Sequence, residues 1–186
     1  MARRVVELNH DSETPIHFVW VGGGPTWTHS LFHYVQLDLK KTGTDQFVHF
    51  VGEQKNPEPY FVASDAFFMS SRVDPFPCVI HEAMASQLPI VTFADSGGAQ
   101  TAIKDGAGFV IPYADYEKAA TLFRMLSDQT HVAASARVRS LDRVHSEYRF
   151  DDYGDELIEL SESIIGESIS NTVKTPFNAT KLRVAA

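Results

Sequence analysis

The segment from Ser70 to Gln87 reads S-S-R-V-D-P-F-P-C-V-I-H-E-A-M-A-S-Q, and it decides the fold expected for this chain. The apolar run at 66–69 before it is typical of a buried strand. After a polar loop we expect a helix that opens at Pro77, because the fixed φ of proline suits the first helical position. The apolar residues of this helix recur at helical spacing and predict the face that packs on a sheet: Ile80, Ala83, Met84 and Leu88.

The start of this helix is expected to be open. The backbone N–H groups near Cys78 and Val79 have no acceptor within a helix, and the helix dipole adds positive charge there, so the terminus accepts an anion, above all phosphate. Asp74 precedes the terminus and Glu82 follows more than one turn later. The two acids are spaced to bind opposite ends of a diphosphate ligand, one at a sugar and the other at a ribose diol. The alternative is that Asp74 only favours the dipole and Glu82 is a solvated surface residue.

The stretch from Asp74 to Val91, D-P-F-P-C-V-I-H-E-A-M-A-S-Q-L-P-I-V, resembles the E-x7-E segment of retaining GT-B glycosyltransferases, most closely family 4 (glycosyltransferase group 1). That segment commonly reads E-G-F-G-x-x-x-x-E-A-M-A-x-G-x-P-V-V. The resemblance extends from about Ile16 to about Ile165. It implies an α/β fold, Rossmann-like with three α/β/α layers and a parallel sheet. This would be one half of a GT-B architecture, the C-terminal, donor-binding domain.

The resemblance also implies residue roles. Glu82 would bind the nucleotide ribose, Asp74 the donor sugar, and the amides of Cys78 and Val79 the diphosphate. Asp74 and Glu82 are therefore the candidate catalytic residues. The turn at 51–54 would lie beside the nucleobase, although a simple turn is the alternative. The candidate substrate-binding residues are Asp74, Phe76, Pro77, Cys78, Val79, Glu82, Gly52 and Glu53.

The sequence departs from the family pattern within the same segment. Asp74 stands where the family has its first Glu, and Pro75 and Pro77 replace two glycines. Pro75 removes an amide that could have contacted the sugar. The sugar that is bound is therefore less certain than the diphosphate.

Size and charge narrow the class of protein. The 186 residues suit one domain, and 44% are hydrophobic, as in a globular protein. The net charge of −8 argues against a nucleic-acid partner. The single cysteine, Cys78, excludes an internal disulfide, and no apolar run approaches the roughly 18 residues of a membrane span. We expect a cytoplasmic protein, with peripheral membrane attachment open for the full-length enzyme.

The order of elements suggests a domain at 1–165 and a mobile tail at 166–186. The chain opens with a helix at 2–9, whereas an α/β domain should open with a strand. We therefore expect the first strand and a preceding N-terminal acceptor domain to be missing. In the family that strand is followed by a G-R and a Lys that clamp the donor phosphates; Arg3 and Arg4 do not match them and are expected to be solvated.

The remaining pattern alternates strands and helices. Ile16–Val21 is a nearly continuous apolar run, as in a central parallel strand. The expected strands are 16–21, 47–51, 66–69, 88–93 and 108–111. The expected helices, besides those at 2–9 and Pro77, begin near Trp27 and cover 58–63, 96–103, 116–126, 131–144 and 150–165.

The resemblance implies the nucleotide-sugar-binding domain of a retaining glycosyltransferase that moves a hexosyl-type sugar to a glycan, lipid or other hydroxyl acceptor. The donor base stays open between UDP, GDP and ADP, and no cofactor is required. This chain alone is expected to bind weakly and to be inactive in transfer. The alternatives are another GT-B enzyme, such as an epimerase or a glycogen-synthase-like protein, and a Rossmann-like module without activity.

No metal site is expected from the spacing of possible ligands. His81-Glu82 begins like the zinc-binding H-E-x-x-H, but Ala85 stands where the second histidine belongs. With one cysteine and scattered histidines, no known zinc spacing is present. His81 is therefore expected to be a residue of the helix surface.

Overall fold

The computed structural model describes residues 2–9, 12–23 and 30–165. The chain divides into two units, Met1–Glu147 and Tyr148–Ala186. The first unit alternates helices and strands, and its strands pair in parallel. The α/β fold with a parallel sheet is therefore confirmed. The tail predicted at 166–186, like Trp27, lies outside the described residues.

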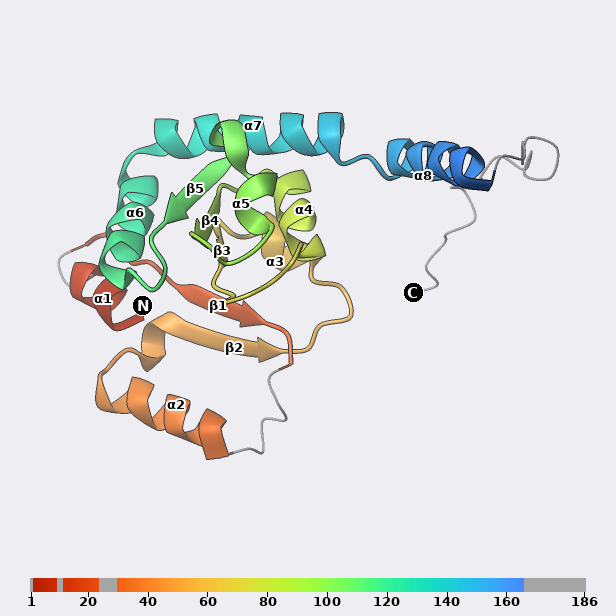
Figure 1. Ribbon diagram of the computed structural model, residues 1–186. Helices are drawn as coiled ribbons and strands as arrows, with labels where there is room; N and C mark the ends of the chain where they lie inside the picture. Colours follow the sequence, from red (N-terminus) through yellow and green to blue (C-terminus); the bar gives the residue numbers. More distant parts are fainter. Residues whose placement is uncertain (1, 10–11, 24–29, 166–186) are drawn as a thin grey trace. The chain divides into compact units, whose positions relative to one another are not determined.

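The five strands of the described residues form two sheets (Figure 1). One pairs β1 with β2, and the other has the order β3-β4-β5. Their bounds are β1 Phe18–Val21, β2 Val48–Gly52, β3 Phe67–Met69, β4 Ile90–Phe93 and β5 Gly108–Ile111. Each strand expected from the sequence is present, with ends that differ by no more than two residues.

Strand β1 is not the central strand that its apolar sequence predicts. Within the described residues it pairs with β2 on one side and has no hydrogen-bonded strand on the other. Val19 and Trp20, which point to opposite faces of a strand, are 48% and 51% exposed. The prediction of burial was wrong. An apolar run indicates that a strand forms, whereas the burial of that strand depends on which strands and helices pack against it.

The helices surround these sheets (Figure 1). Those of the first unit are α1 Ala2–Asn9, α2 Ser30–Lys41, α3 Glu58–Val62, α4 Cys78–Ala85, α5 Ala99–Ala102, α6 Tyr116–Asp128 and α7 Thr130–Glu147, with 3-10 turns η1 Asp45–Phe47 and η2 Lys104–Gly106. The described part of the second unit contains α8, Phe150–Ile165, which begins with two acidic residues, as predicted. Helix α5 is shorter than the predicted 96–103 because Gly98 is its N-cap.

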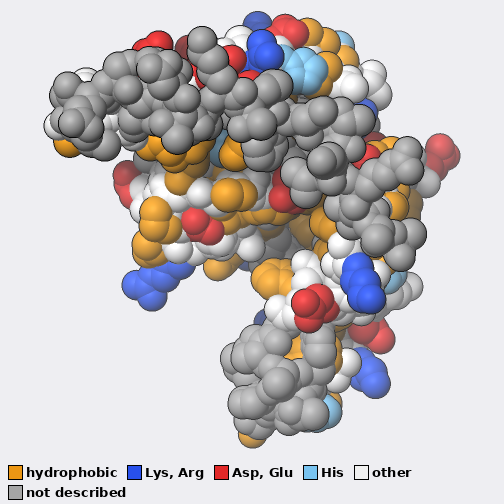
Figure 2. All heavy atoms as spheres, turned by 90° about the vertical axis from the view of Figure 1, so that its right-hand side faces the viewer, with side chains coloured by type: hydrophobic (Ala, Val, Ile, Leu, Met, Phe, Trp, Pro, Cys, Tyr) orange, Lys and Arg blue, Asp and Glu red, His pale blue; other side chains and the backbone are white. Residues whose placement is uncertain are grey.

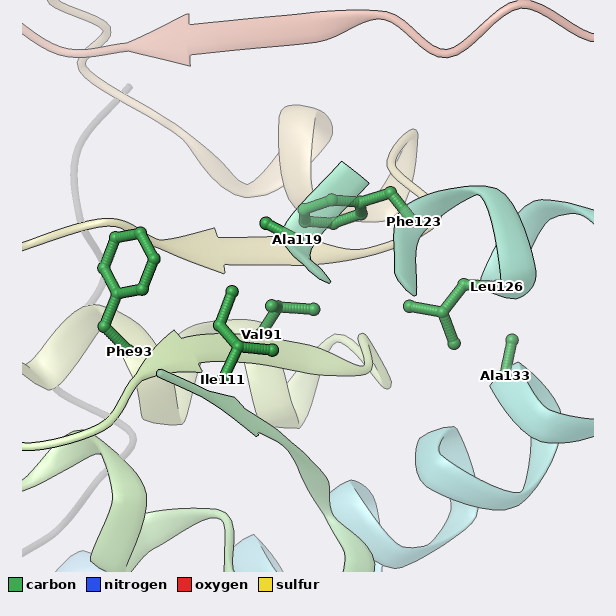
Figure 3. Close-up of a cluster of buried hydrophobic side chains, with 7 residues drawn as sticks. All are labelled: Val91, Phe93, Ile111, Ala119, Phe123, Leu126 and Ala133. Atoms are coloured by element: carbon green, nitrogen blue, oxygen red, sulfur yellow. The ribbon is translucent and has the colours of Figure 1, made fainter. Parts of the chain in front are cut away.

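The hydrophobic core lies between β4, β5 and α6 (Figure 3). It is built from Val91, Phe93, Ile111, Ala119, Phe123, Leu126 and Ala133. The Phe123 ring of α6 meets rings from both sheets edge-on, Phe18 of β1 at 5.9 Å and Phe68 of β3 at 5.5 Å between centroids. Helix α6 thus connects the two sheets through aromatic packing.

Buried polar side chains fix helices to the loops between the strands. Ser140 of α7 donates to the carbonyl of Ala107 at 2.6 Å, and Arg143 donates from Nε to the carbonyl of Ala102 at 2.7 Å. Arg124 of α6 donates to Asn9 Oδ1 and to Ser12 Oγ, both at 2.8 Å. Because buried donors are costly without acceptors, these contacts determine where α7 and α6 lie.

The surface mixes hydrophobic and charged side chains (Figure 2). Arg3 pairs with Asp38, and Arg4 pairs with Glu7 and Glu117, so both are surface residues as predicted. None of the described helices combines the length and the apolarity needed to cross a membrane.

Candidate functional site

The loop from β3 to α4 carries the two candidate acids. Helix α4 begins at Cys78, and Pro77 is its N-cap with φ −71° and ψ 120°. The prediction that Pro77 is the first helical residue was wrong by one position, because this ψ is extended. The Pro77 carbonyl accepts from the Ile80 amide at 3.2 Å, while proline has no side-chain acceptor to cap the helix. The amides of Cys78 and Val79 therefore lie in a first turn that offers them no intrahelical acceptor.

The packing face of α4 holds this terminus firmly. Ile80, Ala83 and Met84 are each 0% exposed, as their spacing predicts. Glu82, on the same helix, is exposed, and Asp74 is half-buried in the loop. The helix thus buries one side in the core and directs Glu82 to solvent, near a terminus that favours negative charge.

A backbone clamp holds the loop that contains Asp74. Asp74 donates its amide to the Ser96 carbonyl at 2.8 Å, and the Gly98 amide donates to the carbonyls of Asp74 at 3.1 Å and Pro75 at 2.9 Å. Asp74 and Gly97 form a parallel bridge. We call the segments Asp74–Phe76 and Ser96–Gly98 together the loop clamp.

The loop clamp requires glycine at two positions. Gly97 has φ +117°, and a Cβ there would overlap the Asp74 carbonyl. A Cβ at Gly98 would overlap both the Pro75 carbonyl and the Phe76 ring. Glycine therefore allows a backbone approach that no side chain permits. Ser96 attaches the loop clamp to the end of β4, because its buried hydroxyl donates to the Phe93 carbonyl at 2.7 Å.

Phe76 covers His81 at the edge of this loop. The rings are 5.2 Å apart between centroids, and Phe76 is 45% exposed. Burial lowers the pKa of His81, opposed by a hydrogen bond to the backbone of Cys78. His81 is half-buried, so it is less exposed than the expected helix-surface residue. It is neutral near pH 7, and it packs beneath Phe76.

The turn at Gly52 and Glu53 belongs to the other sheet. Gly52 has φ +75°, and its carbonyl accepts from the Gly22 amide at 2.8 Å. Glu53 Oε2 would lie 3.9 Å from a Cβ built at Gly23. The turns that follow β1 and β2 therefore lie side by side.

The structure brings some predicted residues together and leaves others apart. Residues 74–79 and 82 form one cluster with the loop clamp, after β3 and β4, whereas Gly52 and Glu53 follow β2. The arrows of β1, β3 and β4 point the same way in Figure 3, so both groups follow carboxyl ends of parallel strands. In open α/β sheets such ends form the ligand crevice. An open groove of about 750 Å³ between α2 and β2 includes only Gly52 of these candidates.

Gly97 and Gly98 are adjacent in the sequence, within the predicted helix at 96–103, but nothing local predicts their contacts with the Asp74 loop. A glycine pair after a strand is the only local signal for such a close approach. The packing of Phe76 on His81 has no signal in the sequence beyond their five-residue spacing. Arg72, the one cation in the loop between β3 and α4, is exposed.

Comparison with known proteins identifies the family of this chain. The family model described as Glycosyl transferases group 1 matches residues 1–128. No match was found among curated proteins.

Solved structures share the fold at low sequence identity. HepE of Anabaena in complex with UDP has a TM-score of 0.76 and 18% identity, over 86% of this chain and 44% of that one. Sucrose-phosphate synthase of Thermosynechococcus elongatus has a TM-score of 0.74 and 18% identity, over 90% and 43%. The C-terminal domain of a glycosyl transferase group 1 protein, LpcC of Francisella tularensis, has a TM-score of 0.67 and 18% identity, over 80% and 77%.

This chain therefore spans less than half the length of HepE and of the synthase. Its parallel α/β fold is the Rossmann-like fold of GT-B glycosyltransferase domains. With residues 1–128 of its 186 covered by the family model, the chain belongs to the glycosyl transferases group 1 family.

Proposed function

We propose that this chain is the donor-binding half of a retaining glycosyltransferase. Its ligand would be a nucleoside diphosphate sugar, and the sugar, of hexosyl type, would pass to a hydroxyl of a glycan, lipid or other acceptor. HepE has been solved with UDP and with UDP-glucose, which supports a nucleotide sugar as the ligand class. Retention and the hexosyl type rest on the resemblance of the segment from Asp74 to Val91.

One observation carries the proposal: the loop clamp holds Asp74 beside the open amino terminus of α4. Two hydrogen bonds from the Gly98 amide and one from the Asp74 amide fix the loop. The first-turn amides of Cys78 and Val79 need an acceptor from outside the helix. A diphosphate supplies both the acceptor oxygens and the negative charge that this terminus favours.

In this arrangement the main contribution to catalysis is electrostatic. The amides of Cys78 and Val79 would stabilise the negative charge that grows on the departing diphosphate. Glu82 would accept hydrogen bonds from the ribose diol, and Asp74 would position the sugar. In the route that the resemblance implies, the acceptor hydroxyl attacks from the same face, and the departing diphosphate helps to remove its proton.

The divided sheet supports a further part of the proposal, a strand between β1 and β3 in the intact protein. Both strands pack on Phe123, through Phe18 and Phe68, but they are not hydrogen-bonded to each other. A strand parallel to both, connected through α1 to β1, would give a right-handed crossover of the usual kind. The acceptor half would precede that strand.

Calorimetric titration of this chain with UDP, GDP and ADP, each with and without EDTA, tests the proposal. We expect weak binding, a preference for one base and no effect of EDTA. No sugar transfer is expected from the chain alone, because the proposal assigns the acceptor half, and the cations that bind the donor phosphates, to another part of the intact enzyme. A preference for ADP would favour the glycogen-synthase-like alternative. If no nucleotide binds, and none binds to a chain extended at its amino terminus, the proposal is refuted in favour of an inactive module.

A further inference from the structure

Two histidines from separate strands lie against each other on the β1–β2 sheet. Nδ1 of His17, which precedes β1, shares a hydrogen bond of 3.0 Å with Nε2 of His49 in β2. The ring that donates must move its proton to its other nitrogen before both of these nitrogens can bind a metal ion. The rings stack at 25° with centroids 5.3 Å apart, and both side chains are exposed. We propose that His17 and His49 together bind one divalent transition-metal ion, Cu²⁺ or Ni²⁺.

The strand register places both imidazoles on one face. Val19 pairs with His49 and Phe18 with Val48, so His17 lies opposite Phe47. Because side chains alternate between the faces of a strand, these positions share a face. The Phe47 ring, 5.4 Å from that of His17, restricts the His17 side chain. The two nitrogens therefore lie within reach of a single ion in this structure.

The separation of the two nitrogens favours some metals over others. A metal ion bound to imidazole nitrogen at about 2.05 Å would subtend an angle of about 94° between nitrogens that are 3.0 Å apart. This is close to the right angle of square-planar or octahedral coordination, as in Cu²⁺ and Ni²⁺. Imidazole is also a ligand that copper and nickel prefer.

The site is open and lies apart from the candidate donor site. No group of three or more His, Cys, Asp and Glu side chains that could hold a metal occurs in the described part of the chain, so water would complete the coordination. The histidines lie at the amino ends of β1 and β2, whereas Gly52 and Glu53 follow the carboxyl end of β2. A bound ion would cross-link the two strands and stabilise this sheet by mass action.

The test is a titration of the chain, without an affinity tag, with CuCl₂ and NiCl₂. We expect one ion per chain. Both H17Q and H49Q should bind the metal ion at least tenfold more weakly. Even replacing a residue that only hydrogen-bonds to a metal ligand lowers metal affinity about 10–100-fold. H145Q, which changes an exposed histidine of α7, should bind as the unmodified chain does. Ni²⁺ should raise the melting temperature of the unmodified chain but of neither pair variant.

The proposal is overturned if H17Q or H49Q keeps full affinity, or if H145Q loses as much as they do. A second measurement does not depend on the folding of variants. Electron paramagnetic resonance of the Cu²⁺-loaded unmodified chain should show coupling to two imidazole nitrogens. Coupling to one nitrogen or none contradicts the site.

Discussion

Strands β4 and β1, one from each sheet of this molecule, are both largely apolar but differ in burial. All four residues of β4 are buried, with Ile90 and Val91 at 0% exposure. In β1, Val19 and Trp20 are about half exposed. The difference is that β4 has a hydrogen-bonded strand on each side, whereas β1 pairs only with β2 among the described residues. Neighbours, and not the apolarity of a strand, decide how much it contributes to the core.

The same difference separates the two groups of candidate site residues. The Asp74 loop is clamped to the residues that follow the buried strand β4. The Gly52–Glu53 turn follows β2, which pairs with the half-exposed strand β1, and the Gly52 carbonyl accepts from the Gly22 amide. The diphosphate part of the candidate site is therefore the firmly supported part.

The largest expected loss of stability comes from shortening one buried side chain, which is compared with shortening a half-exposed one in the other sheet. Ile90→Ala should lower the free energy of unfolding by about 2–5 kcal/mol, because it leaves a cavity in the core. Val19→Ala should cost less than about 1 kcal/mol, since half of that side chain is already in water. Urea unfolding measures both. Equal losses would mean that β1 is as buried as β4, and would contradict the conclusion that β4 contributes more to the core.

Glu82→Gln tests the candidate site on the buried sheet. It should weaken nucleoside diphosphate binding by about 1.5–3 kcal/mol, the usual value of a hydrogen bond to a charged group. Glu58→Gln, an exposed acid at the start of α3, is the matched control and should bind normally. Calorimetry measures both affinities. An unchanged affinity in Glu82→Gln would make Glu82 a solvated surface residue, as in the alternative interpretation.

Gly98→Ala tests the loop clamp. The added Cβ would overlap the Pro75 carbonyl and the Phe76 ring, so we expect a loss of stability of about 1–3 kcal/mol and weaker nucleotide binding. Gly154→Ala is the control, because a Cβ there meets no atom within 4 Å and alanine favours helix α8. Thermal melting and calorimetry measure the two effects. Normal binding by Gly98→Ala would show that the clamp does not position the site.

The smallest effect concerns the pH dependence of stability. Burial lowers the pKa of His81 in the folded state, so below about pH 6.5 the unfolded chain takes up a proton more readily. The contribution of neutral His81 to the free energy of unfolding is therefore fully present above that pH and declines as the pH falls. His81→Gln should show a weaker decline between pH 7.5 and 5.5 in urea unfolding. An identical pH dependence would mean that His81 titrates normally.

The sequence predicted local elements well and long-range relations less well. The spacing of Ile80, Ala83 and Met84 identified the buried face of α4, and 108–111 and 150–165 were found with their observed ends. Periodicity reports which side of an element is apolar, and that information is local. The exposure of Trp20 depends on strand pairing, and so does the meeting of His17 with His49 across 32 residues.

The candidate site was predictable to a similar degree. The acids and the open terminus of α4 follow from the stretch between Asp74 and Glu82, since capping depends on adjacent residues. The bonds from Gly98 to the Asp74 loop could not be predicted, because they join segments that follow two different strands. The predicted start of α4 was one residue early, because Pro77 has an extended ψ of 120° and is the N-cap.

The most direct measurement is an amide NMR titration of this chain with the nucleoside diphosphate that calorimetry selects. We expect the largest shifts on the amides of Cys78 and Val79, with smaller ones near Gly98 and little change at His17. Glu82→Gln should reduce all of these shifts at the same ligand concentration. Shifts confined to the groove between α2 and β2, with Cys78 and Val79 unchanged, would contradict a diphosphate site at the start of α4.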